Sequence, residues 1–102
     1  MLDLRPICEN CAIDLPPAST QARICSYEFT FCRDCVDGIL ENVCPNCGGG
    51  FVPRPIRPVQ AWRKGVSLAD QAPAQERKHR PVGRDEQCAL IARVGAIAPE
   101  NR

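Results

Sequence analysis

Seven cysteines lie within the forty residues from Cys8 to Cys47, and this density constrains the fold more than any other feature of the sequence. Cys25 stands alone, and the other six form C-x-x-C pairs: Cys8 with Cys11, Cys32 with Cys35, and Cys44 with Cys47. A segment of this length buries too little apolar surface to be stable by itself and usually needs disulfides or a metal. The chain of 102 residues is therefore one small domain at most, and a large enzyme fold with a deep cleft is excluded.

The start of the chain helps to choose between disulfides and metal. Residues 1–6 contain no basic segment followed by an apolar stretch, so we expect no signal peptide and a cytoplasmic protein. Thiols stay reduced in that compartment, where clustered cysteines hold metal more often than they form disulfides. No apolar run approaches the roughly 18–20 residues of a membrane span, so we expect no membrane partner.

The cysteine pairs suit zinc, which takes four tetrahedral ligands, because one C-x-x-C turn supplies two thiolates. In a cross-braced arrangement the pairs alternate between two ions. The first site then consists of Cys8, Cys11, Cys32 and Cys35. The second site consists of Cys25, Cys44 and Cys47, and it lacks a fourth ligand because Phe29 occupies that position. In a sequential alternative, one ion is shared by Cys32, Cys35, Cys44 and Cys47. We expect one or two Zn²⁺ per chain.

Phe29 permits two interpretations of the second site. A missing ligand could leave the zinc open to water or substrate, as in catalytic zinc sites. Alternatively, the ring fills a degraded site, or another ligand rescues it. We favour degradation or rescue, since the ring would block a pocket. The candidate rescuers are His79 and Cys88, although a solvated histidine and a thiol on the terminal apolar segment are the simpler interpretations.

The chain divides by charge near residue 52. Residues 1–52 form a cysteine-rich head with a formal charge of −4, and residues 53–102 carry a formal +5. Within the head, alternating residues over 22–31 predict a strand or hairpin, and residues 33–41 predict a short helix. Residues 53–86 read as a Pro/Arg-rich basic linker or disordered tail, and residues 87–98 as a short apolar helix. The expected fold is a small metal-stabilised α+β domain: a zinc-binding treble-clef or RING-like head of β-hairpin, short helix and zinc knuckles, with a mostly disordered tail.

Several segments carry a resemblance to a known family. They are Leu4-Arg5-Pro6, Leu15-Pro16-Pro17, Ile24-Cys25-Ser26, Thr30-Phe31-Cys32-Arg33-Asp34-Cys35 and Val43-Cys44-Pro45-Asn46-Cys47-Gly48-Gly49. Together they resemble a family of small bacterial cysteine-rich proteins catalogued as domain of unknown function 1272, over about residues 1–58. The resemblance implies a bacterial zinc-binding protein and a cysteine where this chain has Phe29. It implies no activity, because the family has none assigned.

The expected function is a non-catalytic zinc-binding protein that acts as a protein-interaction module. The first alternative is nucleic-acid binding, with Trp62 stacking on a base and phosphates contacted by Arg54, Arg57, Arg63, Lys64, Arg77, Lys78, Arg80 and Arg84. The second is a redox switch in which oxidation of thiolates ejects zinc. We do not expect an enzyme: paired carboxylates, a Ser/His/Asp set and a phosphate-binding glycine loop are all missing, and a vacant ligand position argues against a RING-type ubiquitin ligase.

Overall fold

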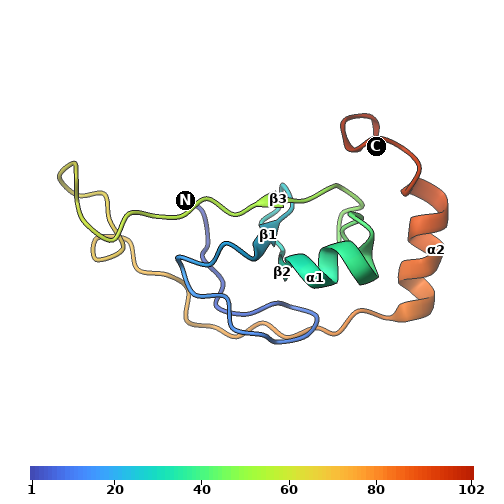
Figure 1. Cartoon of the computed structure of the whole chain (residues 1–102), viewed down its shortest axis with the longest axis horizontal. Helices are drawn as coiled ribbons and strands as arrows, with labels where there is room; N and C mark the ends of the chain where they lie inside the picture. Colours follow the sequence, from blue (N-terminus) through green and yellow to red (C-terminus); the bar gives the residue numbers. More distant parts are fainter.

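The computed structural model describes all of residues 1–102. The molecule is elongated, measuring 47 × 27 × 18 Å along its principal axes. A small sheet and a short helical segment lie at its centre, a loop projects from one end, and helix α2 (Arg84–Val94) stands at the other end (Figure 1). Every residue range predicted from the sequence therefore falls within the described structure.

The sheet is built on the predicted hairpin. Strands β1 (Ala22–Ile24) and β2 (Thr30–Cys32) pair antiparallel, and the two-residue strand β3 (Val52–Pro53) pairs with the other edge of β1. The sequence predicted a strand or hairpin over residues 22–31, and the hairpin is present, although its turn interrupts the alternation and all three residues of β2 are buried. The turn closes where the Glu28 N–H donates to the Cys25 carbonyl oxygen at 3.0 Å. Glu28 itself has a φ of 65°, the left-handed residue that tight hairpin turns of this length require.

A short helical segment follows β2 directly. It consists of the single turn α1 (Arg33–Cys35) and a π-helical stretch, η1 (Val36–Leu40). The thiol of Cys32 caps its start by accepting from the Cys35 N–H at 3.5 Å. Glu41, with a φ of 48°, ends it. The helix predicted over 33–41 is thus present and one residue shorter.

The core is small, and cysteines are part of it. Only 19 of the 102 residues are buried, so apolar burial stabilises this chain weakly for its length. The central cluster joins the hairpin, the helical segment and the N-terminal loops: Cys8, Leu15, Ala22, Phe31, Cys32, Cys35, Val36 and Leu40. Phe51 extends this core by meeting Phe31 edge-on, with ring centroids 5.5 Å apart. Three of the eight members are cysteines, so whatever binds those thiols acts on the core directly.

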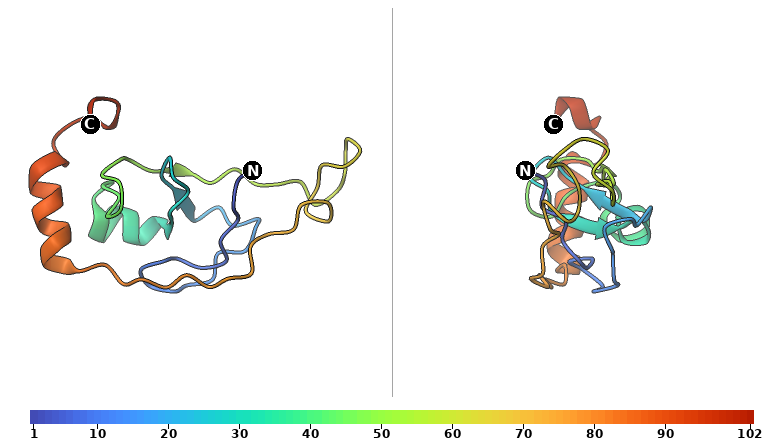
Figure 2. Two further views of the ribbon diagram at one scale, coloured as in Figure 1. Left: turned by 180° about the vertical axis from the view of Figure 1, so that it is seen from behind. Right: turned by 90° about the vertical axis from the view of Figure 1, so that its left-hand side faces the viewer.

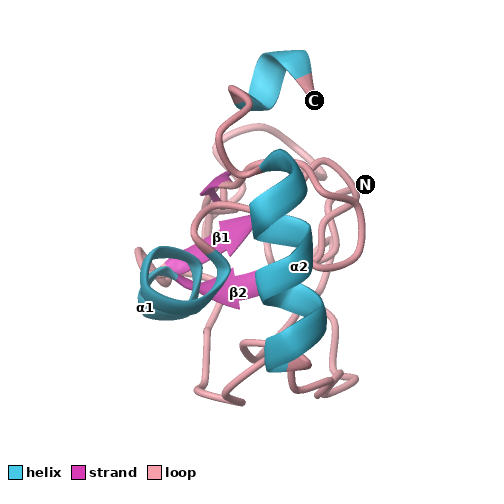
Figure 3. Ribbon diagram, turned by 90° about the vertical axis from the view of Figure 1, so that its right-hand side faces the viewer, coloured by secondary structure: helices cyan, strands magenta, loops and turns pink.

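Helix α2 stands beside the helical segment (Figure 3) and contacts its C-terminal residue, Leu40, through Gln87. It begins three residues before the predicted apolar segment and ends at Val94, followed by a short 3₁₀ turn, η2 (Pro99–Asn101). The one fully buried residue of α2 is polar: the Gln87 amide donates to the carbonyl oxygens of Val43 and Leu40 at 2.9 and 3.3 Å. Leu40 ends the helical segment and Val43 lies in the loop after it, where the Val43 N–H also donates to the Leu40 carbonyl oxygen at 2.9 Å; the Gln87 amide therefore ties α2 to this turn.

The prediction of a disordered tail is wrong. Residues 73–83, called the strap below, run beside the N-terminal loops in both views of the ribbon (Figures 1 and 2). The strap's Ala74 N–H donates to the Leu4 carbonyl oxygen at 3.1 Å, and its Arg80 N–H donates to the Glu9 carbonyl oxygen at 2.7 Å. The head's N-terminal loops contain little regular structure, so their main-chain groups are available to a second segment.

Arg54 and Arg57 fix the start of the tail in the same way. Arg54 is 3% exposed, and its guanidinium donates to the carbonyl oxygens of Arg5, Leu15 and Pro16 at 2.8, 3.1 and 2.9 Å. Burial lowers the pKa of this guanidinium. Arg57 donates to the carbonyl oxygens of Gln71 and Leu2, both at 2.7 Å. The composition suggested disorder because the tail has few apolar residues to bury. The tail is held instead by hydrogen bonds to main-chain oxygens.

Candidate metal centres

Four cysteines from distant segments converge beneath the hairpin. The sulfur atoms of Cys8, Cys11, Cys32 and Cys35 all lie within 4.8 Å of one another, and three of these residues are buried while Cys11 is exposed. The first pair sits in a tight loop closed by the Cys8 N–H, which donates to the Ile13 carbonyl oxygen at 2.9 Å. The second pair sits at the junction of β2 and α1. We call this set the four-cysteine cluster; it joins the N-terminal loop to the helical segment.

The spacing of these sulfurs suits a tetrahedral ion. A Zn–S bond of about 2.3 Å in tetrahedral geometry places neighbouring sulfurs about 3.8 Å apart. The Cys11 and Cys32 sulfurs are 3.8 Å apart, and neither belongs to a disulfide. Two donors also hold the sulfurs in place: the Asn10 amide nitrogen lies 3.3 Å from the Cys35 sulfur, and the Cys35 N–H points at Cys32. The donor set therefore fits a thiolate-binding divalent metal.

A second group of thiols gathers at the other end of the hairpin. The sulfurs of Cys25, Cys44 and Cys47 lie within 4.8 Å of one another, with Cys47 the most accessible of the three. Cys25 opens the hairpin turn, and the other two come from the loop that follows the helical segment. Two hydrogen bonds of 2.8 Å close that loop. The Cys44 N–H donates to the Gly49 carbonyl oxygen, and the Gly48 N–H donates to the Cys44 carbonyl oxygen. We call this set the three-cysteine cluster.

The free thiols of both clusters are mostly hard to ionise. Burial raises the pKa of Cys35, and the neighbouring thiolates of Cys8 and Cys32 add to that rise. Burial likewise raises the pKa of Cys44, although the N–H groups of Asn46 and Cys47 act in the opposite direction. Several thiols this close together cannot all lose their protons without a cation between them. A divalent ion bound between the sulfur atoms would supply the positive charge that ionisation of the thiols requires in both clusters.

Cys11 and Cys25 differ in the direction of their shifts. Burial acts to raise the pKa of Cys11, but the N–H of Ile13 and the surrounding thiols outweigh it and lower the pKa overall. Burial raises the pKa of Cys25 despite the N–H groups of Tyr27 and Phe29. Both clusters thus contain two thiols with raised pKa values, and the four-cysteine cluster also contains one thiol, Cys11, whose pKa is lowered.

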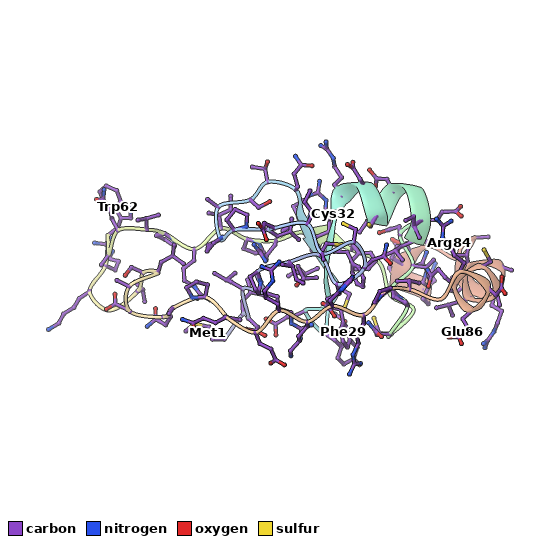
Figure 4. All side chains as sticks on the ribbon, turned by 90° about the horizontal axis from the view of Figure 1, so that it is seen from below. Met1, Phe29, Cys32, Trp62, Arg84 and Glu86 are labelled. Atoms are coloured by element: carbon purple, nitrogen blue, oxygen red, sulfur yellow. The ribbon has the colours of Figure 1, made fainter.

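Phe29 stands where the sequence places a missing ligand. The register of the hairpin brings it opposite Cys25, whose N–H donates to the Phe29 carbonyl oxygen at 3.3 Å. Facing residues of a hairpin project from the same side of the sheet. The Phe29 ring (Phe29 is labelled in Figure 4) packs against the core cluster. Its centroid lies 5.3 Å from Cζ of the Arg5 guanidinium. An aromatic ring held in this way donates nothing to a metal.

Neither candidate rescuer belongs to the three-cysteine cluster. His79 lies on the strap, where its Nε2 is 3.1 Å from the carbonyl oxygen of Asn10, beside the four-cysteine cluster. Cys88 lies on α2 and is exposed. The structure also does not bring together the four cysteines of the sequential alternative. The two sets that it does form are those of the cross-braced arrangement.

Asn10 is a site residue that sequence reasoning missed. Its side chain donates to the Cys35 sulfur, and its Oδ1 accepts from the Val82 N–H of the strap at 2.9 Å. It therefore links one cluster to the strap. Its position inside a C-x-x-C pair was the available signal, although the C-terminal pair also contains an asparagine, Asn46, with no such contact.

The tail cations proposed for nucleic-acid contact are partly committed elsewhere. Arg54 and Arg57 bind main-chain oxygens of the head and of the tail itself, and Arg77 pairs with Asp14 at 3.2 Å. Arg63 and Lys64 stay exposed beside Trp62. Three of the eight proposed cations are therefore engaged within the protein, and the free positive charge on the tail is smaller than the sequence suggested. None of the helices has the length and apolar character that crossing a membrane requires.

Comparison with known proteins gives two findings. The model of the family described as "Protein of unknown function (DUF1272)" matches residues 1–57. The "Uncharacterized protein R02474" of Rhizobium meliloti (strain 1021) is 53% identical over 64 residues, which cover 63% of this chain and 76% of that protein. No solved structure matches. The matched family region contains both cysteine clusters and ends shortly after β3.

Proposed function

The chain belongs to the DUF1272 family, and we propose that it is a non-catalytic zinc-binding protein whose metal stabilises a protein-interaction module. The observation that carries the zinc assignment is the four-cysteine cluster, whose sulfurs have the spacing of a tetrahedral thiolate site. Thiolates favour zinc or iron–sulfur clusters over hard cations such as magnesium and calcium. Zinc fits a structural role because it has no redox chemistry of its own.

The interlaced clusters support a RING-like, cross-braced organisation. Along the chain, the cysteines of the two clusters alternate: Cys8 and Cys11, then Cys25, then Cys32 and Cys35, then Cys44 and Cys47. Each ion would therefore bridge segments on both sides of the other cluster's ligands. Such bridges would join the hairpin to the segments before and after it and would add to the stability of a small core.

The interaction surface that we propose is the loop of residues 58–72. It projects from the end of the molecule opposite α2, with Trp62 near its tip (Figures 1 and 4). Trp62 is 76% exposed, and Val59 and Val66 are 71% and 53% exposed. An apolar groove of about 290 Å³ lies at its base, lined in part by Leu2, Ile56 and Val66. Exposed aromatic residues beside an apolar groove are typical of protein-binding surfaces.

Metal content tests the first half of the proposal. Protein purified under reducing conditions without chelator should contain zinc and no iron, measured by elemental analysis and native mass spectrometry of one sample. Removal of the metal with a chelator should abolish the dispersed NMR spectrum of the head. A metal-free preparation that keeps this spectrum, or a preparation joined by disulfides, would overturn the proposal.

Site-specific crosslinking tests the second half. A photo-reactive residue in place of Trp62 should crosslink a defined protein in cells, and the same residue in place of Tyr27 should not. Tyr27 is a matched control because it is 68% exposed on the hairpin turn, away from the loop. Equal crosslinking at both positions would argue against the loop as the interface. Recovery of nucleic acid at position 62 would favour nucleic-acid binding through Trp62, Arg63 and Lys64 instead.

A further inference from the structure

The three-cysteine cluster offers three thiols to a metal ion and has no fourth donor of its own. No other histidine, cysteine, aspartate or glutamate joins Cys25, Cys44 and Cys47 within the distance that unites their sulfurs. The two candidates from the sequence are engaged or placed elsewhere, as described above for His79 and Cys88. A tetrahedral zinc held by this cluster would therefore receive no fourth ligand from the folded chain.

The same cluster is accessible from outside. Cys25 and Cys44 are buried, but Cys47 is exposed, so the cluster reaches the surface at one edge. The chain that follows Cys47 is a run of three glycines. A β-carbon at Gly48 would meet no atom within 4 Å, and one at Gly49 would meet only the Cys47 sulfur at 3.4 Å. Open space thus adjoins the accessible thiol on the side of Gly48 and Gly49, whereas a β-carbon at Gly50 would lie 3.0 Å from Pro99.

We infer that zinc in the three-cysteine cluster takes its fourth ligand from outside the folded chain, and that this ligand is a thiolate. The inference rests on the proposed zinc function. Three thiolates already exceed the charge of Zn²⁺, so a bound water is polarised less than at a catalytic zinc with neutral ligands. A soft sulfur donor suits such a centre better than a hard oxygen donor.

The exchange itself is a simple ligand substitution. A thiol would lose its proton to solvent and its sulfur would bind the zinc in place of a water molecule, with no change of oxidation state. Two sources could supply the thiolate. One is a small free thiol, and the other is the exposed Cys88 of a second copy of this chain.

Cobalt substitution tests the inference without any assay of activity. Protein reduced with a phosphine, which adds no thiol, is loaded with Co²⁺, whose visible absorption reports the ligands of each site. Titration with 2-mercaptoethanol should shift the bands of one cobalt and leave those of the other unchanged, with saturation at one thiol per chain and no loss of metal. The four-cysteine cluster serves as the unchanged reference within the same molecule.

Two variants identify the source and the site. Phe29→Cys offers a thiol opposite Cys25, so its cobalt spectrum should not respond to added thiol. Cys88→Ser should respond like the wild type if the ligand is a small thiol. If the ligand is Cys88 of a second copy, the wild-type protein should form a metal-dependent dimer that 2-mercaptoethanol dissociates and that Cys88→Ser lacks.

The remaining outcomes separate this inference from the proposed function. Two bound metals without any spectral response to thiol or any metal-dependent dimer would overturn the inference and leave the zinc function intact. One metal per chain would do the same, since the three-cysteine cluster would then hold none. Protein that binds no metal would overturn both. If Phe29→Cys does not fold, the thiol titration of the wild-type protein still decides the result, because the bands of its four-cysteine cluster serve as the reference.

Discussion

The two cysteine clusters use the same chemistry in different surroundings. The four-cysteine cluster contributes three of its members to the hydrophobic core, and the strap passes over its N-terminal loop. The three-cysteine cluster lies outside that core set, ends at an exposed cysteine and adjoins a glycine run. The three-cysteine cluster lacks a fourth ligand because the hairpin has a phenylalanine, Phe29, at the position where a ligand is expected. Under the proposed function, the four-cysteine cluster would hold a metal that stabilises the head, and the three-cysteine cluster would exchange its outer ligand.

Removing one cysteine from each cluster should produce the largest difference. Structural zinc contributes about 10–16 kcal/mol of apparent folding free energy, which is comparable with or larger than the roughly 5–15 kcal/mol net stability of a typical domain. We therefore expect Cys35→Ser to unfold the head and Cys44→Ser to leave it folded with less metal. Circular dichroism and amide NMR spectra, with metal analysis, measure both effects. A well-dispersed spectrum for Cys35→Ser would contradict the difference between the clusters.

Acidification should separate the clusters next. Zinc must displace protons from the thiols, so its affinity falls as the pH falls. Each cluster has two thiols with raised pKa values, Cys32 and Cys35 in one and Cys25 and Cys44 in the other, but only the four-cysteine cluster adds a thiol with a lowered pKa, Cys11, and so a fourth ligand of its own. The three-cysteine cluster should therefore release zinc first, at the higher pH. Native mass spectra recorded at decreasing pH should show a one-zinc species; direct loss of both ions in one step would argue against it.

The metal-free protein should show the opposite dependence on pH. A thiol whose pKa is raised by folding stabilises the folded state below its ordinary pKa of about 8.5, and this stability is lost as the pH rises toward the folded value. Cys25, Cys32, Cys35 and Cys44 all shift upward. Any residual structure of the metal-free head should therefore melt at lower temperature above about pH 8.5. Thermal melts between neutral and alkaline pH measure this, and an increase in melting temperature would contradict it.

The smallest effect should come from two asparagines in matching positions. Asn10→Ala removes a hydrogen bond to the Cys35 sulfur and another to the strap, so we expect a loss of about 1–2 kcal/mol of stability. Asn46 occupies the same place in the C-terminal pair and is exposed, so Asn46→Ala should change stability by less than about 0.5 kcal/mol. Denaturant unfolding of the zinc-loaded proteins compares them. Equal losses would show that Asn10 does not distinguish the clusters.

Much of the head could be predicted from residue spacing. The alternation before Cys32 predicted the hairpin, and the sequence of residues 33–41 predicted the short helix. Spacing alone left the cross-braced and sequential groupings of cysteines both open. The hairpin decides between them, because it places Cys25 at one end and Cys32 at the other, within reach of different partners.

The tail could not be predicted in the same way. Its composition resembles that of disordered segments, yet Arg54 is buried and Gln87 is the buried residue of α2. Both side chains bind main-chain carbonyl oxygens, which every residue carries. A hydrogen bond to a main-chain carbonyl oxygen does not require any particular residue type as its acceptor. The sequence therefore contains no signal for such a bond.

The sequence by itself determined the chemistry of this protein: thiol ligands in C-x-x-C pairs, a head too small to fold on apolar burial alone, and a missing donor at Phe29. These follow from residue identity and short-range spacing, which the chain carries in any conformation. Only the tertiary structure decided which thiols meet, that the strap lies against the four-cysteine cluster, and that the three-cysteine cluster reaches the surface. Those features depend on contacts between segments far apart in the chain, and they exist only once the hairpin and the tail have docked.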